Sequence, residues 1–471
     1  MKSDEFRKYA HELADWMADY LDNVENYPVK PSTKPNDILN QLPIHPPNEH
    51  EPFDAIFNDF KNIIIPGVTH WQSPNFMAYF PANSSRISVL AEMLTATLGL
   101  QCMIWLTSPS ATELEERVME WLREMLGLPS SFTGVIQDTA STSTLVAILT
   151  AREKKTNYQS NTQGMNMKGI FTTYCSEEAH SSVEKDVKIA GLGKEHLRKI
   201  KTDENFAMIP EELEKTIKQD LEQNFIPLCV IATMGSTSST AVDPLRKIGE
   251  ICHKYQIWFH VDGALSGSAL ILPEKRWMSD GMEYVDSFVF NPHKWLFTNF
   301  DLSAYYVKDV GALIQTFEIL PEYLKTKEDK QVNNYRDWGI QLGRRFRALK
   351  LWFVIRHYGV SGLQEKIRFH LDLTKNLKEK IEKNPNFELL APVPVNTICF
   401  RYKPQNKAFN DEQLDELNVS LLEKINNTGK LFLTHTKLRN RYTLRIVIGQ
   451  TEVTNKHVER AWDLITTFAH I

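Results

Sequence analysis

No uninterrupted apolar run of about 18 residues occurs in the 471-residue chain, so we expect no membrane span. The opening residues, MKSDEFRKYAHELADW, also lack the apolar core of a signal peptide. Cysteine is scarce, and its five residues are far apart without any CxxC pair. We therefore expect neither a disulfide framework nor a metal site. We expect the protein to lie in a reducing, cytoplasmic compartment.

The chain also has no large excess of positive or negative charge. The 54 basic side chains nearly balance the 59 acidic ones, which leaves a formal net charge of −5. This balance gives no electrostatic signature of binding to nucleic acid or to an anionic membrane. The motifs HExxH, GxSxG, GxGxxG and the P-loop pattern are also absent. Zinc proteases, α/β-hydrolases, dinucleotide-binding enzymes and nucleotidases therefore lose support.

The sequence pattern divides the chain into three parts. Residues 1–85 start with an amphipathic helix over 4–21 and continue with a proline-rich stretch, which predicts an arm that docks on its own subunit or on a neighbour. Residues 86–362 alternate helical patterns with short β-rich runs, which predicts a large α/β domain with a mostly parallel sheet covered on both faces. Residues 363–471 have the pattern of a smaller α+β domain.

Five strands are predicted in the large domain, at 134–137, 170–174, 228–233, 257–261 and 287–290. The spacing from Ser110 to Glu113 is that of a capping box and predicts a helix start. Residues 325–338 are polar and aperiodic, which predicts a mobile loop. Because ligands of open α/β sheets bind at the carboxyl ends of the strands, functional side chains are expected directly after these runs.

Asp262 follows the strand at 257–261, where a carboxylate is costly unless a cation meets it. The protonated ring nitrogen of pyridoxal phosphate is one such cation, although an aspartate at this place more commonly caps a helix. Lys294 follows the strand at 287–290 among apolar and aromatic neighbours. Desolvation there would lower its pKa and favour a Schiff base, whereas a snorkelling surface lysine is the ordinary alternative.

Two hydroxyl-rich turns and one histidine also follow strands. Residues 138–144 (DTASTST) open a predicted helix and could hold a phosphate dianion, or could simply cap the helix. Residues 234–239 (MGSTSS) form a second turn of this kind and could line a cofactor. His180 could stack on a flat heterocycle, although a lone histidine is more often structural.

Together and in this order, these residues resemble the group II pyridoxal-phosphate decarboxylases, most closely the aromatic-L-amino-acid decarboxylases. The resemblance covers nearly the whole chain. Its most specific stretches are SPNFMAYFP (73–81), SP with TELE (108–115), AHSS (179–182), HVD (260–262), FNPHKW with NFD (290–301), YRDW (335–338) and LGRRFR (342–347).

The resemblance implies an aspartate-aminotransferase-like fold (fold type I) and a homodimer with its active site at the subunit interface. Lys294 would hold the cofactor as a Schiff base, and Asp262 would pair with its ring nitrogen. Ala264 and His180 would pack on opposite faces of the ring, and Tyr335 would protonate the substrate Cα. The other implied cofactor contacts are Thr139, Ala140, Ser141 and His293 at the phosphate, Asn291 close by, and Thr237 near the ring oxygen.

The implied substrate pocket has an apolar wall that suits an indole or phenyl ring. Its residues are Trp71, Tyr79, Phe80, Pro81, Ala82, Met103, Ile104 and Trp105. Ala82 stands where animal relatives that act on a catechol have a hydroxyl residue, and Met103 replaces a phenylalanine. We therefore expect tryptophan or phenylalanine as substrate ahead of tyrosine or dihydroxyphenylalanine.

Other departures from the family pattern are Gly263-Ala264-Leu265 after Asp262, and Asp138-Thr139 where Gly-Ser is common. A phenylalanine at the loop position of Tyr335 accompanies aldehyde formation in related plant proteins, so the tyrosine favours simple decarboxylation. An aldehyde synthase, a decarboxylase of non-aromatic amino acids and a catalytically silent binding protein are the alternatives.

Overall fold

The computed structural model describes residues 1–165, 169–319, 331–405 and 408–469. The chain forms two compact units. The large unit comprises residues 82–372 and 391–399, and the small unit comprises residues 1–81, 373–390 and 400–471. The predicted division at residues 85 and 362 stays a prediction, and the structure groups the N-terminal arm with C-terminal segments. No helix among the described residues is long and apolar enough to cross a membrane.

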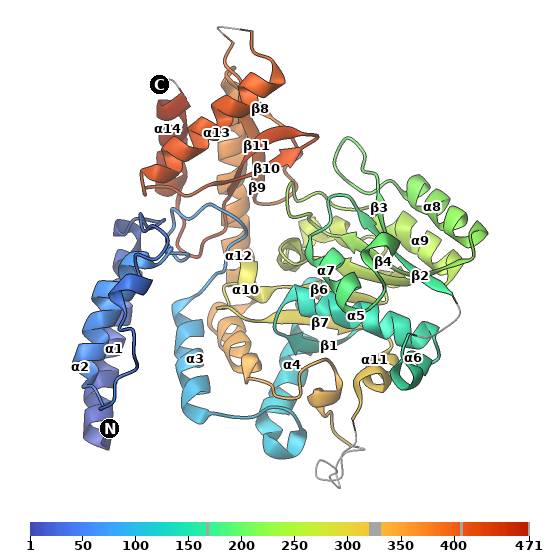
Figure 1. Ribbon diagram of the computed structural model, residues 1–471, viewed down its shortest axis with the longest axis horizontal. Coiled ribbons are helices and arrows are strands. Elements are labelled where there is room, and N and C mark those ends of the chain that lie inside the picture. Colours follow the sequence, from blue (N-terminus) through green and yellow to red (C-terminus); the bar gives the residue numbers. More distant parts are fainter. Residues whose placement is uncertain (166–168, 320–330, 406–407, 470–471) are drawn as a thin grey trace. The chain divides into compact units, whose positions relative to one another are not determined.

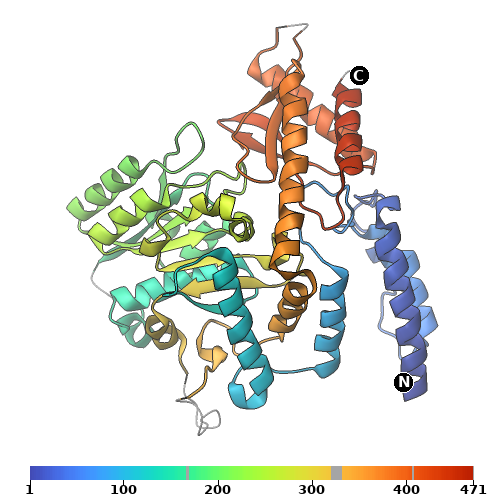
Figure 2. The ribbon, with the colours of Figure 1, turned by 180° about the vertical axis from the view of Figure 1, so that it is seen from behind.

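A seven-stranded sheet forms the centre of the large unit, with helices on both of its faces (Figures 1 and 2). The strand order is β1-β7-β6-β5-β4-β2-β3, and β7 alone runs against its neighbours. The sheet is therefore mostly parallel, as predicted. The strands are β1 (Thr133–Gln137), β2 (Ile170–Ser176), β3 (Leu197–Ile200), β4 (Phe225–Thr233), β5 (Trp258–Asp262), β6 (Ser287–Phe290) and β7 (Ser303–Val307).

The central strands are buried on both faces, since consecutive side chains point to opposite sides and nearly all of β4 and all of β5 and β6 are buried. Helix α5 crosses β4, β5 and β6, and α8 and α9 pack on β4. The helices of this unit are α3 (Arg86–Leu98), α4 (Pro109–Leu126), α5 (Ala140–Lys155), α6 (Gln159–Gln163), α7 (Ser182–Ile189), α8 (Pro210–Glu222), α9 (Leu245–Tyr255), α10 (Pro292–Trp295) and α11 (Val310–Phe317).

The predicted capping box at Ser110 is wrong. Helix α4 begins at Pro109, and its N-cap is Ser108, whose hydroxyl accepts a hydrogen bond from the Ala111 backbone N–H at 3.3 Å. Proline is well suited to the first helical position, because its missing N–H would have no partner there and its φ is already helical. The serine before the proline is consequently the cap, and Glu113 hydrogen-bonds the indole of Trp105 instead.

The small unit pairs an N-terminal helical arm with a four-stranded sheet. Helix α1 (Ser3–Asn23) buries no residue fully but packs aromatic side chains on α2 (Phe53–Asp59), with the Tyr9 and Phe53 rings 4.3 Å apart. The sheet order is β10-β11-β9-β8. The other elements of this unit are β8 (Phe387–Leu389), β10 (Thr434–Leu438), β11 (Arg441–Val447), α13 (Asp411–Asn427) and α14 (Asn455–Ala469). The residues of β9 (Thr397–Tyr402) and of α12 (Arg347–Lys383), which contains a non-helical Gly359, are divided between the two units.

Candidate active site

The carboxyl ends of β4, β5 and β6 meet at one edge of the large sheet. Asp262 ends β5, where the strand register places it opposite Thr233 of β4 and Val289 of β6. Its side chain is 8% exposed, and Oδ1 accepts a hydrogen bond from the Ala264 N–H at 2.9 Å. Within the described chain, no hydrogen bond reaches its second oxygen, Oδ2. A buried carboxylate with one free oxygen at this place is suited to meet a cation.

Lys294 lies on the short helix α10, directly after β6. Its half-buried side chain belongs to a turn that is anchored at both ends. The Asn291 N–H donates to the Ala264 carbonyl at 2.9 Å, which ties this turn to the one after β5. Asn83 holds the other side, with its Nδ2 donating to the Lys294 carbonyl at 2.9 Å and its N–H donating to the His293 carbonyl at 3.0 Å.

His180 lies between β2 and α7, and both Asp262 and Lys294 affect the pKa of its ring. The pKa of His180 is lowered, chiefly by desolvation and further by Lys294, while Asp262 opposes this shift. Its Nδ1 accepts the Ser182 N–H at 3.2 Å, so the proton of the neutral ring lies on Nε2. The structure thus brings together the three residues expected at the cofactor ring. Although the pKa shift indicates desolvation, part of the His180 side chain remains exposed.

The residues expected to contact the phosphate lie at the N-terminus of α5. Thr139 is its N-cap, with Oγ1 accepting the Thr142 N–H at 3.3 Å, and Ser141 lies half-buried in the first turn. Ala140 is packed into the core. The first backbone N–H groups of a helix favour an anion at this end. Asp138 lies just before them, and its Oδ1 accepts the Thr139 N–H at 2.6 Å.

Three further predicted contacts lie on the turns after β4 and β6. His293 is buried, and its Nδ1 accepts the Leu302 N–H at 2.9 Å. Burial and the nearby Lys294 charge lower the pKa of His293 to about 3, so the ring is neutral and its Nε2–H can serve only as a donor. Asn291 is buried with Oδ1 accepting the Ser303 hydroxyl at 2.6 Å, whereas Thr237 is exposed.

Tyr335 lies in a short 3-10 helix, Tyr335–Asp337, and is only 3% exposed. Its ring packs edge-on against Trp338 at 5.2 Å and lies 4.7 Å from the Arg344 guanidinium. Burial raises the pKa of Tyr335 well above its usual value, with Glu115 adding to the shift. The part of the predicted loop at 325–330 lies outside the described residues, while Tyr335 itself is packed rather than exposed.

The residues of the predicted apolar wall are distributed over both units. In the small unit, Trp71 and Tyr79 are 38% and 51% exposed and their rings stack at 5.9 Å. Phe80 of this unit lies 4.6 Å from the Arg445 guanidinium, and Pro81 is buried.

The wall residues of the large unit lie beside the tyrosine turn. The Met103 carbonyl accepts the Arg336 N–H at 2.9 Å, and the Trp105 N–H donates to Asn334 Oδ1 at 3.0 Å. Ile104, the residue between Met103 and Trp105, is buried, and Ala82 is half-buried. The segment from Met103 to Trp105 is therefore fixed against the residues on either side of Tyr335.

The side chains and the helix end at this edge of the sheet have the chemistry needed to bind pyridoxal phosphate. A carboxylate with a free oxygen, a half-buried lysine, an exposed neutral imidazole and a hydroxyl-rich helix N-terminus match the ring nitrogen, aldehyde, ring face and phosphate of that molecule. The hydroxyls of Ser266 and Ser268, just beyond Ala264, are buried without a hydrogen-bond partner. Neither was among the predicted contacts.

Sequence reasoning also missed the residues that support the site. Asn83 gave no local signal, because its role depends on chain segments about 210 positions apart. His260 was quoted only as part of a motif. It is fully buried, with Nδ1 and Ser287 Oγ at 2.9 Å and Nε2 and Thr144 Oγ1 at 3.3 Å. Burial lowers the pKa of His260 to about 4, so it stays neutral and links α5 to two central strands.

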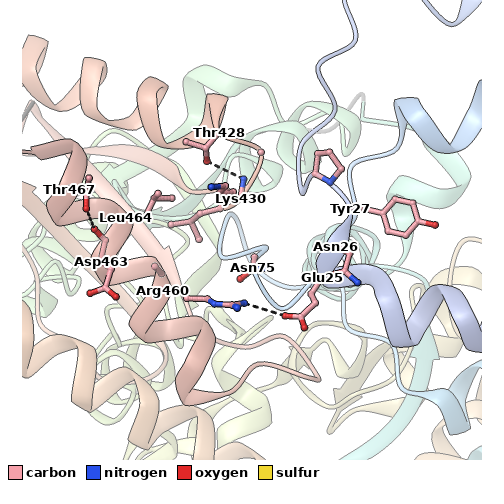
Figure 3. A pocket seen from close by; sticks show the side chains of 14 residues that line it. Glu25, Asn26, Tyr27, Asn75, Thr428, Lys430, Arg460, Asp463, Leu464 and Thr467 are labelled. Atoms are coloured by element: carbon pink, nitrogen blue, oxygen red, sulfur yellow. Dashed lines mark hydrogen bonds and ion pairs between the residues drawn. The ribbon is translucent and has the colours of Figure 1, made fainter.

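A large cavity of about 620 Å³ lies elsewhere, in the small unit (Figure 3). Glu25, Tyr27, Lys430 and Arg460 are among its lining residues, and Glu25 and Arg460 form an ion pair at 3.6 Å. None of the predicted site residues lines it. The Arg460 side chain is largely exposed, and the cavity shows no group with the chemistry expected here, so its volume alone does not make it the active site.

Comparisons with known proteins agree with the chemistry at the sheet edge. The family model "Pyridoxal-dependent decarboxylase conserved domain" matches residues 35–403. The chain is 42% identical to phenylacetaldehyde synthase of Arabidopsis thaliana over 99% of this chain and 96% of that protein. It is also 42% identical to tyrosine decarboxylase 4 of Petroselinum crispum, over 100% and 94% respectively.

A solved structure gives the same result for the fold. The structure of Oryza sativa TDC with PLP and tryptamine superposes with a TM-score of 0.97 at 35% identity, covering 100% of this chain and 98% of that one. The predicted fold type, the cofactor pyridoxal 5′-phosphate and a carboxy-lyase activity are thereby confirmed. The chain belongs to the pyridoxal-dependent decarboxylase family.

Proposed function

We propose that the enzyme decarboxylates an aromatic L-amino acid, with tryptophan or phenylalanine favoured, to the corresponding arylalkylamine and CO₂. The observation that carries this proposal is the meeting of Asp262, His180 and Lys294 at the ends of the strands, where Asp262 and Lys294 both affect the pKa of His180. This arrangement has the groups needed to anchor a pyridoxal cofactor and to keep its ring nitrogen protonated.

Bound pyridoxal phosphate supplies an electron sink for the electrons left on Cα when CO₂ departs. Asp262 would hold the proton on the ring nitrogen, and Lys294 would anchor the cofactor. His180 presents a neutral ring face and keeps a proton on Nε2. Tyr335 donates a proton to Cα, and its raised pKa keeps the phenol protonated until it does so.

The aromatic substrate class rests on the apolar wall and on the relatives. Tyrosine and tryptophan decarboxylases from plants are 40–42% identical to this chain over nearly its whole length. Ala82 offers no hydroxyl to a catechol, which favours an indole or phenyl ring over dihydroxyphenylalanine. A screen for amine release over the twenty amino acids plus dihydroxyphenylalanine tests this directly. Release from glutamate or an aliphatic amino acid alone would contradict the proposal.

An aldehyde synthase is the second candidate, because phenylacetaldehyde synthase of Arabidopsis thaliana is among the relatives at 42% identity. The tyrosine at position 335 favours the amine as product. Assays for amine, aldehyde and hydrogen peroxide on the same reaction separate the two activities. The variant Lys294→Ala is the control, since it should lose steady turnover and the absorbance of bound cofactor in either case.

We also propose that the enzyme is a homodimer with its active site at the subunit interface. Helix α3 exposes an apolar stripe of Leu90, Met93, Leu94 and Leu98, which are 39–54% exposed and spaced to lie on one helical face. A monomer rarely leaves such a stripe in water, so a second copy of the chain is its proposed occupant. Light scattering should give the mass of a dimer, and Leu90→Glu with Leu94→Glu should give a monomer.

The proposed compartment is the cytoplasm. All five cysteines lie in the described part of the chain, all are buried, and none forms a disulfide. Reduced cysteines are typical of that compartment. Imaging of a fluorescent fusion in cells tests this placement, and a signal confined to an organelle would contradict it.

A further inference from the structure

Arg344 is a buried arginine that none of the roles above uses. It is 9% exposed, and its guanidinium lies 4.7 Å from the centre of the Tyr335 ring. A cation at this distance is attracted to the face of an aromatic ring, and the attraction is stronger where water is excluded. Since this ring belongs to the proposed proton donor, the partners of Arg344 decide how firmly that donor is held.

A buried carboxylate and a strand hold the guanidinium in place. Nη2 of Arg344 lies 2.6 Å from Oε1 of Glu115, a residue of α4 that is 3% exposed. The same nitrogen donates to the Ile136 carbonyl of β1 at 2.7 Å, and the Ile136 N–H donates to Glu115 Oε1 at 2.9 Å. Arginine, carboxylate and strand therefore form one closed set of contacts, and charge-assisted hydrogen bonds fix the position of the guanidinium.

The backbone of Arg344 and the turn that carries the tyrosine are tied to neighbouring segments. The Arg344 N–H donates to Gln101 Oε1 at 2.7 Å, and its carbonyl accepts the Cys102 N–H at 3.0 Å. Gln137, the last residue of β1, donates through Nε2 to the Trp338 carbonyl at 3.0 Å. Because β1 leads into the N-terminus of α5, the tyrosine turn and the helix end where the phosphate is expected have a common support.

The charge of Arg344 also acts on the phenol. Burial raises the pKa of Tyr335, Glu115 and Glu116 add to this shift, and Arg344 opposes it. A donor that is too weak an acid transfers its proton slowly, so a cation beside the ring favours the transfer. Arg344 therefore affects both the position of the ring and the acidity of its hydroxyl.

We propose that Arg344 is a positioning residue for Tyr335, which it holds so that the phenolic hydroxyl meets the substrate Cα. The proposal rests on the proposed role of Tyr335 as the proton donor. In that step the phenolic O–H bond breaks, a Cα–H bond forms with the electron pair that CO₂ leaves behind, and the phenolate regains a proton from water. When the ring is not held, the transfer is slower and molecular oxygen takes two electrons instead. The products are then aldehyde, ammonia and hydrogen peroxide, and water supplies the aldehyde oxygen.

The test compares three variants of the full-length holoenzyme. Arg344→Met removes the cation but leaves the Glu115 carboxylate buried without its partner, which is destabilising. The double variant Glu115→Gln with Arg344→Met removes both charges at similar side-chain volume and avoids that cost. Arg344→Lys keeps the charge but loses the planar guanidinium that meets two acceptors and the ring.

Arg198 offers a matched control in the same unit. Its guanidinium pairs with Asp220 at 2.7 Å and lies 5.3 Å from the Phe225 ring, and Asp220 is 3% exposed. Arg198→Met therefore removes a comparable ion pair and a comparable ring contact, but between β3 and α8 rather than beside Tyr335. A general loss of stability should affect both arginine-to-methionine variants alike.

The first readout needs no turnover. Hydrogen exchange, measured by mass spectrometry on peptides that cover residues 335–339, follows the N–H groups of Arg336 and Trp338, which are hydrogen-bonded in the tyrosine turn. Exchange there should be about two- to thirtyfold faster in Arg344→Met and in the double variant, which is the range that a cation over a ring is worth. It should be unchanged in Arg198→Met.

The second readout is the ratio of amine to aldehyde formed from the same substrate. It should fall by about the same two- to thirtyfold factor in the double variant, less in Arg344→Lys, and not in Arg198→Met. Wild-type exchange in the double variant, or faster exchange with a wild-type product ratio, would overturn the inference. The proposed role of the phenol fails separately, if Tyr335→Phe releases amine at the wild-type rate.

Discussion

The side-chain amide of Asn83 donates a hydrogen bond to the backbone carbonyl of Lys294 at 2.9 Å. The backbone N–H of Asn83 donates to the carbonyl of His293 at 3.0 Å. Asn83→Ala leaves the Lys294 carbonyl without this donor, at a cost of about 1–3 kcal/mol. Since the lysine turn loses an anchor, cofactor affinity should fall about tenfold, measured by absorbance titration of the apoprotein. Unchanged affinity with a lower melting temperature would mean that Asn83 stabilises only the fold.

Tyr335→Phe should retain the cofactor and lose amine formation. A positioned general acid contributes about 10²–10⁴-fold to a rate, so amine release should fall by that order while cofactor absorbance is unchanged. Aldehyde and hydrogen peroxide should appear in place of the amine, as the family resemblance implies. Tyr255→Phe, which removes a hydroxyl that bonds Glu214 on the surface, is the control. Wild-type amine production by Tyr335→Phe would refute the role of the phenol.

Asp138 places a carboxylate directly before the helix end that is expected to hold the phosphate. Its Oδ1 accepts the Thr139 N–H, and its Oδ2 accepts the Gln341 amide at 3.0 Å. Asp138→Asn keeps an oxygen for the Thr139 N–H but removes the charge that repels a phosphate dianion. Affinity for pyridoxal phosphate should rise severalfold at low salt, since screening weakens the repulsion at high salt. Pyridoxal, which has no phosphate, should bind both proteins alike.

His260 gives the fold a specific pH dependence. Its pKa is about 4 in the folded protein and about 6.5 when unfolded, so the unfolded chain binds more protons between these values. Stability from this group is therefore complete above pH 6.5 and is lost as the pH falls toward 4. The loss between pH 7 and pH 5 should be about 2 kcal/mol.

Comparison of variants isolates this contribution, because Asp243, with a pKa raised to about 6 by burial, acts in the opposite direction over part of the range. Urea unfolding at pH 7, 6 and 5 should show a weaker pH dependence for His260→Gln than for wild type. The exposed His45→Gln should match wild type. Equal slopes for all three proteins would show that His260 does not carry the effect.

The sequence analysis could identify those candidate site residues that have a recognisable pattern in the residues next to them. Asp262 and Lys294 follow short apolar runs rich in β-branched and aromatic residues, and such runs became strands whose carboxyl ends meet. The hydroxyls after β1 opened a helix for the same local reason. Asn83 was missed, because its partner lies far away in the chain and only the tertiary fold brings the two near.

The region around Tyr335 shows the same limit. Its polar sequence predicted a mobile loop but gave no sign that the Tyr335 ring packs against Trp338 and Arg344. Neither contact has a periodic signature, since both occur within an irregular segment. Edge-to-face packing and a cation over the ring nevertheless stabilise such a turn.

Ala82 provides the sharpest test of substrate preference. It stands where a hydroxyl residue is found in animal relatives that act on a catechol, and its half-buried side chain belongs to the proposed wall. Ala82→Ser adds a donor and acceptor with little added volume, so it should favour a catechol hydroxyl by one hydrogen bond, about 0.5–1.5 kcal/mol. The ratio of kcat/KM for dihydroxyphenylalanine to that for phenylalanine should therefore rise about two- to tenfold. Ala82→Cys, which has a similar size but a weak donor, should change the ratio much less, and equal ratios for Ala82→Ser and wild type would remove position 82 from the specificity of the enzyme.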